Sequence, residues 1–356
     1  MNVLRAWFER NFSNPQTVIL ALLLLGGFVV VFYMGKMLAP LLAAVVIAYL
    51  LEAVVQLAER RGMPRLPAVA IVFTLFVVVF LFLVLWLVPM LSRQVAQLAH
   101  DLPRHIDAAR QLLMRLPELY PQLFTEEQVR DLVNSLQKEL AGLGQTLLSL
   151  SLGWIPSLIA LAVYLILVPM LVFFFLKDKS QIVGWVGSYL PRQRELAARV
   201  WAEVDLQIGN YIRGKFAEIL IIGGASYITF VLMGLNYAAL LGALVGLSVV
   251  IPYIGATVVT IPVAMIAYFQ WGWSSEFAYL MLAYGIIQAL DGNVVVPLLF
   301  SEAVNLHPVA IIVAVLVFGG LWGFWGVFFA IPLATLVKAV LTAWPKAEEP
   351  VEPEPA

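Results

Sequence analysis

Residues 289–332 read A-L-D-G-N-V-V-V-P-L-L-F-S-E-A-V-N-L-H-P-V-A-I-I-V-A-V-L-V-F-G-G-L-W-G-F-W-G-V-F-F-A-I-P, and this apolar stretch decides the fold. It is long enough to lie in a membrane, yet it carries polar side chains and is interrupted by prolines and glycines. Such groups are stable at membrane depth only where protein or a water-filled cavity surrounds them. We therefore predict that this stretch lines a functional site. Its polar residues are Asp291, Asn293, Glu302, Asn305 and His307.

The composition of the whole chain is that of a membrane protein. Of its 356 residues, 62% are hydrophobic and 12% are charged, whereas about a quarter of a soluble domain is charged. We predict an all-α polytopic membrane protein with about seven to eight transmembrane helices. Two of its apolar segments should be broken or re-entrant, and one amphipathic helical insertion should lie outside the membrane.

Charge and cysteine content exclude several classes of function. The net charge is −1, so the chain has no basic surface of the kind that binds nucleic acid. With no cysteine it forms no disulfide and no thiolate metal site. The three histidines are too dispersed to predict a metal centre. We therefore expect no metal and no cofactor.

Changes in composition divide the chain into five segments. Residues 1–91 form a three-span region, and residues 92–150 form an extracytoplasmic amphipathic insertion. Residues 151–215 hold a fourth span and a cytoplasmic amphipathic helix. Residues 216–342 form a transport core with broken helices, and residues 343–356 form a disordered acidic tail.

Three local signals refine this division. The Arg-rich linker at 58–66 and the basic excess in 177–215 predict that both termini are cytoplasmic, because positive loops stay inside. The first apolar run lacks a signal-peptide cleavage site, so it should remain as an anchor. Within the insertion, T-E-E-Q at 125–128 predicts a helix start with Thr125 as N-cap and Gln128 in the reciprocal position.

Two apolar segments are too long to be single spanning helices. Residues 237–270 would extend about 51 Å as one helix, against a hydrocarbon core of about 30 Å. The sequence breaks this segment at V-V-I-P-Y-I-G-A (249–256), and it breaks 308–342 at G-G-L-W-G-F-W-G (319–326). Each segment could cross once or fold back. Paired broken segments are typical of a transporter binding site, although small residues also favour close helix packing alone.

Several of these motifs together carry a family resemblance. They are Y-I-R-G-K (211–215), I-P-Y-I-G (251–255), D-G-N-V-V-V-P (291–297), L-H-P (306–308), and L-W-G-F-W-G followed by A-I-P-L-A (330–334). With these motifs the chain resembles the autoinducer-2 exporter family, which includes PerM-type permeases. The resemblance covers nearly the whole chain and is most specific from 211 to 334.

The resemblance implies a multi-pass protein of the bacterial inner membrane that assembles as a homo-oligomer, such as a pentamer. Some members of the family are credited with exporting autoinducer-2 and others with sodium (lithium)/proton antiport. The substrate therefore does not follow from the family name. Expected partners are the lipid bilayer and either a small polar solute or a monovalent cation or proton.

Asp291 is the strongest candidate for a site residue, because an acid at membrane depth is a cation ligand or proton carrier by default. The alternative is a carboxylate that caps a helix break. Asn293 either shares the ligand shell of Asp291 or forms hydrogen bonds with backbone groups freed by the helix break. Glu218 either binds substrate or pairs with Arg213 or Lys215. The full set of substrate or ion-binding candidates is Asp291, Asn293, Pro252, Tyr253, Gly255 and Glu218.

Other residues are candidates for conformational roles. His307 could sense pH, because histidine changes charge near neutral pH. The candidates for helix breaking and gating are Gly319, Gly320, Gly323, Gly326, Pro297 and Pro308.

Together these observations predict a secondary transporter that exports a small polar solute of the autoinducer-2 type. Sequence reasoning leaves three alternatives open: a Na⁺(Li⁺)/H⁺ antiporter with an intramembrane aspartate, a non-transporting scaffold that uses the helices of 92–150, and a channel. An enzyme is not expected, because the sequence contains no H-E-x-x-H motif and no G-x-S-x-G motif. It also has no Walker motif, so ATP should not drive it directly.

Overall fold

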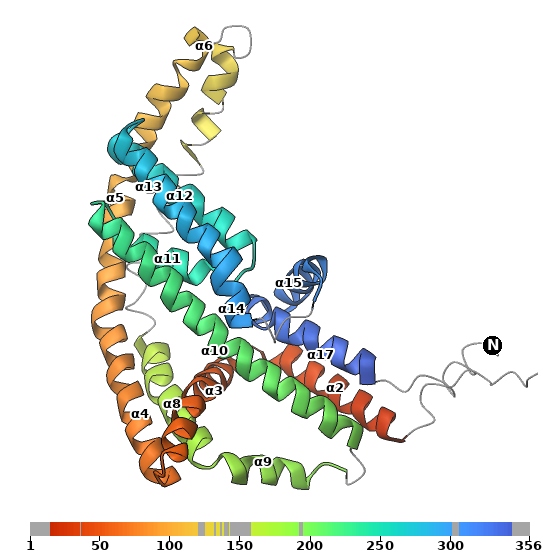
Figure 1. Ribbon diagram of the computed structural model, residues 1–356. Coiled ribbons are helices and arrows are strands. Elements are labelled where there is room, and N and C mark those ends of the chain that lie inside the picture. The colour runs from red at the N-terminus through yellow and green to blue at the C-terminus, as the bar shows by residue number, and fades with distance from the viewer. Residues whose placement is uncertain are drawn as a thin grey trace, which may run out of the picture. The chain divides into compact units, whose positions relative to one another are not determined.

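The computed structural model describes residues 15–35, 37–119, 125–131, 133–135, 137–138, 142, 158–191, 195–300 and 306–343. Within these ranges the regular structure is helical (Figure 1). The helices in chain order are α2 (Pro15–Met34), α3 (Ala39–Arg60), α4 (Arg65–Phe82), η1 (Leu83–Leu87), α5 (Val88–Leu113), α6 (Leu116–Leu119), α8 (Leu158–Lys177), α9 (Lys179–Ser188), α10 (Glu195–Leu232), α11 (Ala238–Ser248), α12 (Ile254–Trp271), α13 (Ser275–Leu290), η2 (Asp291–Val295), α14 (Val296–Phe300), α15 (Pro308–Trp322), α16 (Phe324–Phe328) and α17 (Ala330–Ala343).

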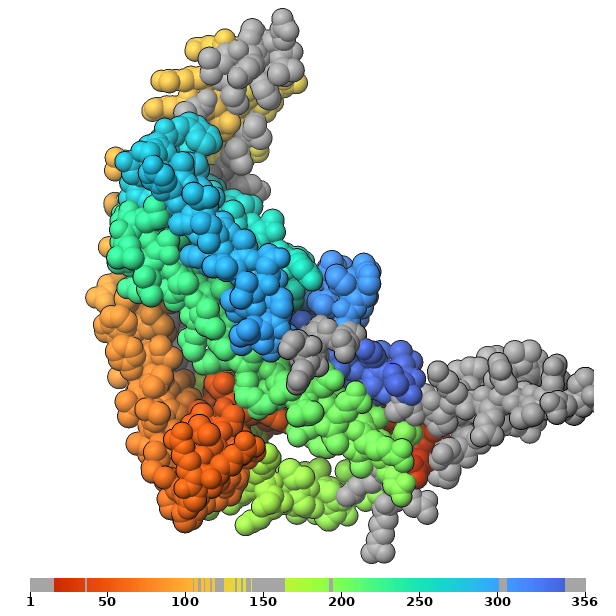
Figure 2. Space-filling model, viewed as in Figure 1, coloured from red at the N-terminus to blue at the C-terminus, as the bar shows by residue number. Residues whose placement is uncertain are grey.

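The structure confirms an all-α polytopic membrane protein. Among the described residues, six helices are long and apolar enough to cross a membrane: Gln16–Met34, Ala39–Arg60, Arg65–Arg104, Glu195–Leu232, Ile254–Trp271 and Ser275–Phe300. Shorter apolar helices accompany them, including Pro308–Trp322. Large apolar side chains stay on the surface, such as Leu75, Val78 and Phe82 of α4, which is orange in the space-filling view (Figure 2). Such a surface suits lipid rather than water.

The chain forms two compact units, the first built from three separated segments and the second from two. The first unit comprises Met1–Val72, Leu167–Phe216 and Leu298–Ala356, and the second comprises Phe73–Ile166 and Ala217–Pro297. The boundaries of these units differ from those of the five segments predicted from the sequence. The division into five segments stays a prediction. The predicted tail lies outside the described residues, apart from its first residue.

The core of the second unit lies among α10, α11, α12 and α13. Phe230, Leu241, Val263 and Leu280 are almost completely buried there. Glycines let α10 and α11 approach closely. A Cβ atom at Gly246 would lie 2.8 Å from the Ile219 carbonyl oxygen. A larger residue at this position would therefore push the two helices apart, as at the small-residue interfaces of membrane helices.

The long segment 237–270 folds back on itself. Its two ends meet: the Asn236 backbone N–H donates to Gln270 Oε1 at 2.8 Å, and Gln270 Nε2 donates to the Gly234 carbonyl at 2.7 Å. α11 and α12 therefore form an antiparallel hairpin. At its closed end, a Cβ atom on Gly255 would overlap the Ser248 carbonyl oxygen. The close approach of the two helices thus requires glycine at this position.

The C-terminal segment of the first unit folds back in the same way (Figure 1). α15 ends at Trp322, Gly323 takes a positive φ of 59°, and α17 returns beside α15 after the short α16. A Cβ atom on Gly326 would overlap the Phe318 carbonyl oxygen. The alternative that either segment runs on as one helix is therefore excluded.

α5 carries the chain from the second unit's apolar helices into the amphipathic insertion. It lies beside α11, where Gln94 Oε1 accepts a hydrogen bond from the Leu240 backbone N–H at 2.8 Å. The Tyr237 hydroxyl donates to Asp101 at 2.5 Å. Further along, Thr125 and Gln128 form the predicted reciprocal cap, with N···O distances of 3.2 and 3.3 Å. The helix start predicted at 125–128 is thus confirmed.

Candidate functional site

Asp291 lies within a long apolar helix at the point where the helical geometry changes. Ser274 caps α13, its side chain accepting from the Phe277 N–H at 3.4 Å. The helix continues to Leu290 and then becomes the π-helical turn η2, whose first residue is Asp291. Its side chain is 8% exposed. Turns of π-helix are rare and occur frequently at functional sites. Asp291 therefore stays a candidate site residue.

Asn293 lies in the same turn and is exposed. Its Nδ2 donates to the Ala289 carbonyl at 2.8 Å, so the side chain forms a hydrogen bond with the backbone of its own helix. Pro297 follows in α14. Val295, from the other end of the turn, packs against the core of α10–α13. The π turn is therefore anchored to the core of the second unit.

The break between α11 and α12 contains Pro252 and Tyr253. Tyr253 has a φ of +63° and its side chain is 59% exposed. The N–H of Ile254 donates to the Pro252 carbonyl at 2.7 Å, and that of Gly255 donates to the Ile251 carbonyl at 2.9 Å. The broken backbone is thus closed by local turns.

Glu218 lies deep on α10 and is 2% exposed. Lys215, three residues earlier, is 4% exposed, and its Nζ lies 5.0 Å from the centre of the Phe300 ring. Arg213 instead donates to Asn210 Oδ1 at 2.8 Å. Glu218 and Lys215 are thus two buried, oppositely charged residues three positions apart on α10.

The remaining candidates lie in the first unit. His307 is the N-cap of α15, where its Nδ1 accepts from the Val309 N–H at 3.2 Å, and Pro308 is the first helical residue. Gly320 has open space around it. The sequence grouped these residues with Asp291 in one core, whereas the structure assigns them to a different compact unit. Glu302 and Asn305 lie outside the described residues.

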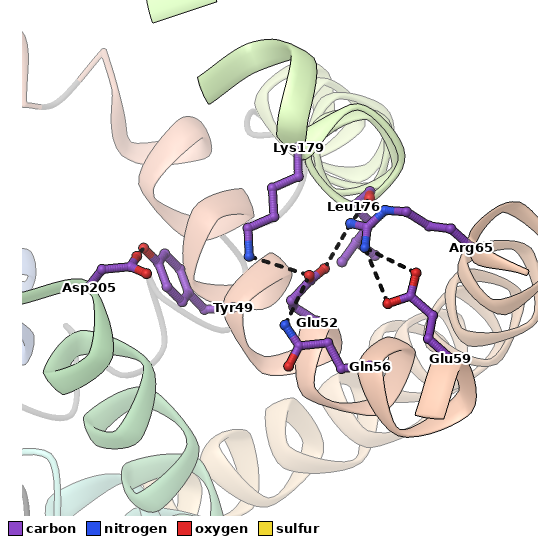
Figure 3. Close-up of polar contacts among 8 residues, drawn as sticks. All are labelled: Tyr49, Glu52, Gln56, Glu59, Arg65, Leu176, Lys179 and Asp205. Carbon is purple, nitrogen blue, oxygen red and sulfur yellow. Dashed lines mark hydrogen bonds and ion pairs between the residues drawn. The ribbon is translucent and has the colours of Figure 1, made fainter. Parts of the chain in front are cut away.

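Sequence reasoning missed a polar cluster in the first unit, centred on Glu52 of α3 (Figure 3). The Glu52 carboxylate accepts from Arg65 at 3.2 Å, from Lys179 at 3.3 Å and from Gln56 at 3.3 Å. Arg65 also donates to the Leu176 carbonyl at 2.6 Å and pairs with Glu59 at 3.3 Å. Because that carbonyl is among the last of α8, which lack helical partners, Arg65 both caps α8 and neutralises Glu52.

A second polar pair lies next to this cluster. The Tyr49 hydroxyl of α3 donates to the Asp205 carboxylate of α10 (Figure 3). A cavity of about 270 Å³ lies against both groups, lined by Tyr49, Glu52, Lys179, Trp201 and Asp205 together with apolar side chains of α3, α8 and α9. We call this cavity the α3–α10 pocket.

The signal for this pocket in the sequence was weak. Tyr49 and Glu52 are three residues apart in an apolar run and so share a helix face. Their partners Asp205 and Lys179 are separated from them by 156 and 127 residues. Nothing in the local pattern predicts which distant segments meet α3.

A larger cavity of about 520 Å³ lies inside the α15–α17 hairpin. Its lining is apolar except for Lys338 and Thr342. It therefore offers few polar groups for binding or chemistry. In the part of the chain that the structure describes, no three His, Cys, Asp or Glu side chains are grouped to hold a metal ion.

Comparisons with known proteins agree with this membrane architecture. The profile of the family described as "AI-2E family transporter" matches residues 18–346. The chain is 46% identical to PerM of Escherichia coli (strain K12), named as a permease, over 98% of this chain and 99% of that one. It is 27% identical to the transport protein YueF of Bacillus subtilis (strain 168), over 86% and 84%. It is 24% identical to the "AI-2 transport protein TqsA" of Escherichia coli (strain K12), over 87% and 86%.

These relatives are permeases and transport proteins rather than enzymes, and their similarity extends over nearly the whole chain. Together with the six candidate spans, they describe a multi-pass bacterial membrane protein that transports a solute. The chain belongs to the AI-2E family of transporters.

Proposed function

We propose that this chain is a secondary transporter that exports a small polar solute of the autoinducer-2 type. Membership of the AI-2E family supports transport, and the name of the TqsA relative supports this class of solute. The more similar PerM is named as a permease without a stated solute. The solute therefore has to be measured directly.

One structural observation carries the mechanism: a buried carboxylate, Asp291, at a π-helical turn within the apolar helix Ser275–Phe300. Charged side chains within apolar membrane helices are costly and rare. By default this carboxylate is therefore a candidate ligand for a cation, proton or polar solute. The α11–α12 hairpin belongs to the same compact unit. In this mechanism Asp291 supplies charge or carries a proton while the broken helices alternate access.

The test is flux in sealed proteoliposomes that contain the purified protein. Vesicles loaded with autoinducer-2 should release it faster than protein-free vesicles. Asp291→Asn should lower the rate at least about tenfold, the order of effect expected for losing a charged buried contact. Glu276→Gln is the matched control, because it removes an exposed acid from the first turn of the same helix.

Size-exclusion chromatography of each variant shows whether it assembles. Normal release by an assembled Asp291→Asn protein would refute the role of Asp291. A pH change on addition of Na⁺ or Li⁺, without autoinducer-2 release, would instead establish antiport. Absence of both fluxes from the unchanged protein would favour a scaffold.

We further propose that both termini face the cytoplasm and that the protein assembles as a homo-oligomer in the inner membrane. The basic linker at 58–66 supports the orientation. The many exposed apolar side chains of α15 fit either lipid or a neighbouring copy. Mass measurement in native nanodiscs determines the number of copies.

A further inference from the structure

The α3–α10 pocket has an uneven charge distribution. At one side, the Glu52 carboxylate is neutralised by both Arg65 and Lys179. At the other side, Asp205 accepts a hydrogen bond from the neutral Tyr49 hydroxyl. Among the described residues, no lysine or arginine forms an ion pair with Asp205. The pocket therefore presents one carboxylate whose charge is not balanced by a neighbouring cation.

The charges of the whole cluster lead to the same result. The carboxylates are Glu52, Glu59 and Asp205, and the cations are Arg65 and Lys179. One negative charge is in excess, and the geometry locates it at Asp205. Removing a charge from water is costly unless an opposite charge is near, so a cation in the pocket would be stabilised there.

The walls of the pocket define the rest of such a ligand. Most of the lining is apolar, with aliphatic side chains from α3, α8 and α9. Three aromatic side chains, Tyr49, Phe175 and Trp201, contribute to it. Aromatic faces attract cations at short range, and apolar walls favour an apolar body. A hydrated metal ion would gain little from these walls, because hard cations prefer a shell of oxygen ligands.

We propose that the α3–α10 pocket binds a small organic cation that carries one protonated amine on an apolar body. The ammonium group would lie against Asp205 and the Tyr49 oxygen, and the apolar body would contact Phe175 and the aliphatic wall. The volume of about 270 Å³ suits a ligand of one ring rather than a large one. This site uses none of the residues assigned to solute export, so it goes beyond the proposed function and does not depend on it.

Calorimetric titration of the full chain in lipid nanodiscs tests the site, with empty nanodiscs as the baseline. The probes are benzylammonium, its neutral analogue benzyl alcohol and the anion benzoate. Benzylammonium should bind saturably with one site per chain. The alcohol and benzoate should bind at least about tenfold more weakly, because they lack the charge-assisted contact with Asp205.

Three variants on α10 locate the binding. Asp205→Asn should weaken benzylammonium binding at least about tenfold, while Asp205→Glu should retain most of it. Glu203→Gln removes an exposed acid two residues away and should leave binding unchanged. Equal binding of the three probes to the unchanged chain, or unaltered binding by Asp205→Asn, would overturn the proposal. The comparison of probes needs no variant, so it decides the question even if Asp205→Asn does not assemble.

Discussion

Glu52 is a single residue that links several helices of the first unit. Its carboxylate on α3 holds Arg65 at the start of α4 and Lys179 at the start of α9, and Arg65 in turn caps α8. The Glu52 side chain is 11% exposed, whereas those of Arg65 and Lys179 are 35% and 48% exposed. The acid is thus the most enclosed member of the group, and its loss leaves two cations without their shared partner.

Glu52→Gln should lower the free energy of unfolding by about 1–3 kcal/mol, because partly buried ion pairs are costly to break from one side. Glu59→Gln is the matched control. Glu59 contacts only Arg65 of these cations and its side chain is 29% exposed, so its loss should cost less than about 1 kcal/mol. Thermal melts in detergent compare the two. Equal melting temperatures for both variants would show that Glu52 has no special structural role.

Tyr237 lies in the turn before α11 and gives a prediction about pH. Burial and the neighbouring Asp101 raise its pKa to about 12, above the ordinary tyrosine value near 10. The pKa is higher in the folded than in the unfolded chain, so the stabilisation is complete below about pH 10 and is lost as pH rises toward 12. Tyr237→Phe should cost about 1 kcal/mol at neutral pH.

Melting temperatures measured between pH 7 and 11 test this expectation. The difference between the parent protein and Tyr237→Phe should stay constant to about pH 10 and then shrink. A difference that shrinks already below pH 9 would assign the effect to another group.

Each of the two hairpins is closed by a glycine that touches backbone. A side chain on Gly255 or Gly326 meets a carbonyl oxygen of the preceding helix, which cannot move aside as a flexible side chain would. Gly320 is nearby on α15 but has open space around it. Gly255 and Gly326 are thus required for close contact between helices, whereas Gly320 is not.

Gly255→Ala and Gly326→Ala should each destabilise the protein by about 3 kcal/mol or more, because the hairpin must open to relieve the overlap. Gly320→Ala should be neutral or slightly stabilising, since alanine favours a helix by about 0.5–1 kcal/mol over glycine. Expression level and melting temperature are the measurements. Similar losses at all three positions would argue against the close approaches described here.

At the element level, the sequence predicted where the helices break but not how they pack. Pro252, Gly255 and the glycines of 319–326 marked both breaks, because proline and glycine act locally. The folding back of each segment could not be predicted, because it depends on contacts between positions far apart in the chain, such as Asn236 with Gln270. The reciprocal cap at Thr125 was predictable because it depends on four consecutive residues.

The polar clusters could not be predicted for the same reason. Glu52 stands alone in its apolar run, and its partners come from other helices. Asp291 was recognisable because an acid in an apolar helix is unusual on its own. The change to π-helix at Asp291 was not predicted from the sequence.

At the scale of the whole molecule, the orientation in the membrane can be tested cleanly because the chain has no cysteine. Met63→Cys in the basic linker and Glu126→Cys in the insertion both introduce thiols at exposed positions. In intact cells, a membrane-impermeant maleimide should label Glu126→Cys and not Met63→Cys, as positive-inside orientation requires. In inside-out vesicles the pattern should reverse. Labelling of Met63→Cys in intact cells would invert the proposed topology.

The π-helical turn η1 has a consequence for how the long helix Arg65–Arg104 tolerates change in length. A π turn holds one residue more than an α turn. Removing one residue from Leu83–Leu87 would restore a regular α-helix, and the residues after it would keep nearly the same orientation relative to residues 73–82, because the π turn holds its extra residue within about the same rotation. Gln94 and Asp101 would then still face Leu240 and Tyr237. Natural variation here should therefore appear as the gain or loss of a single residue in this turn, with the contacts between α5 and α11 retained.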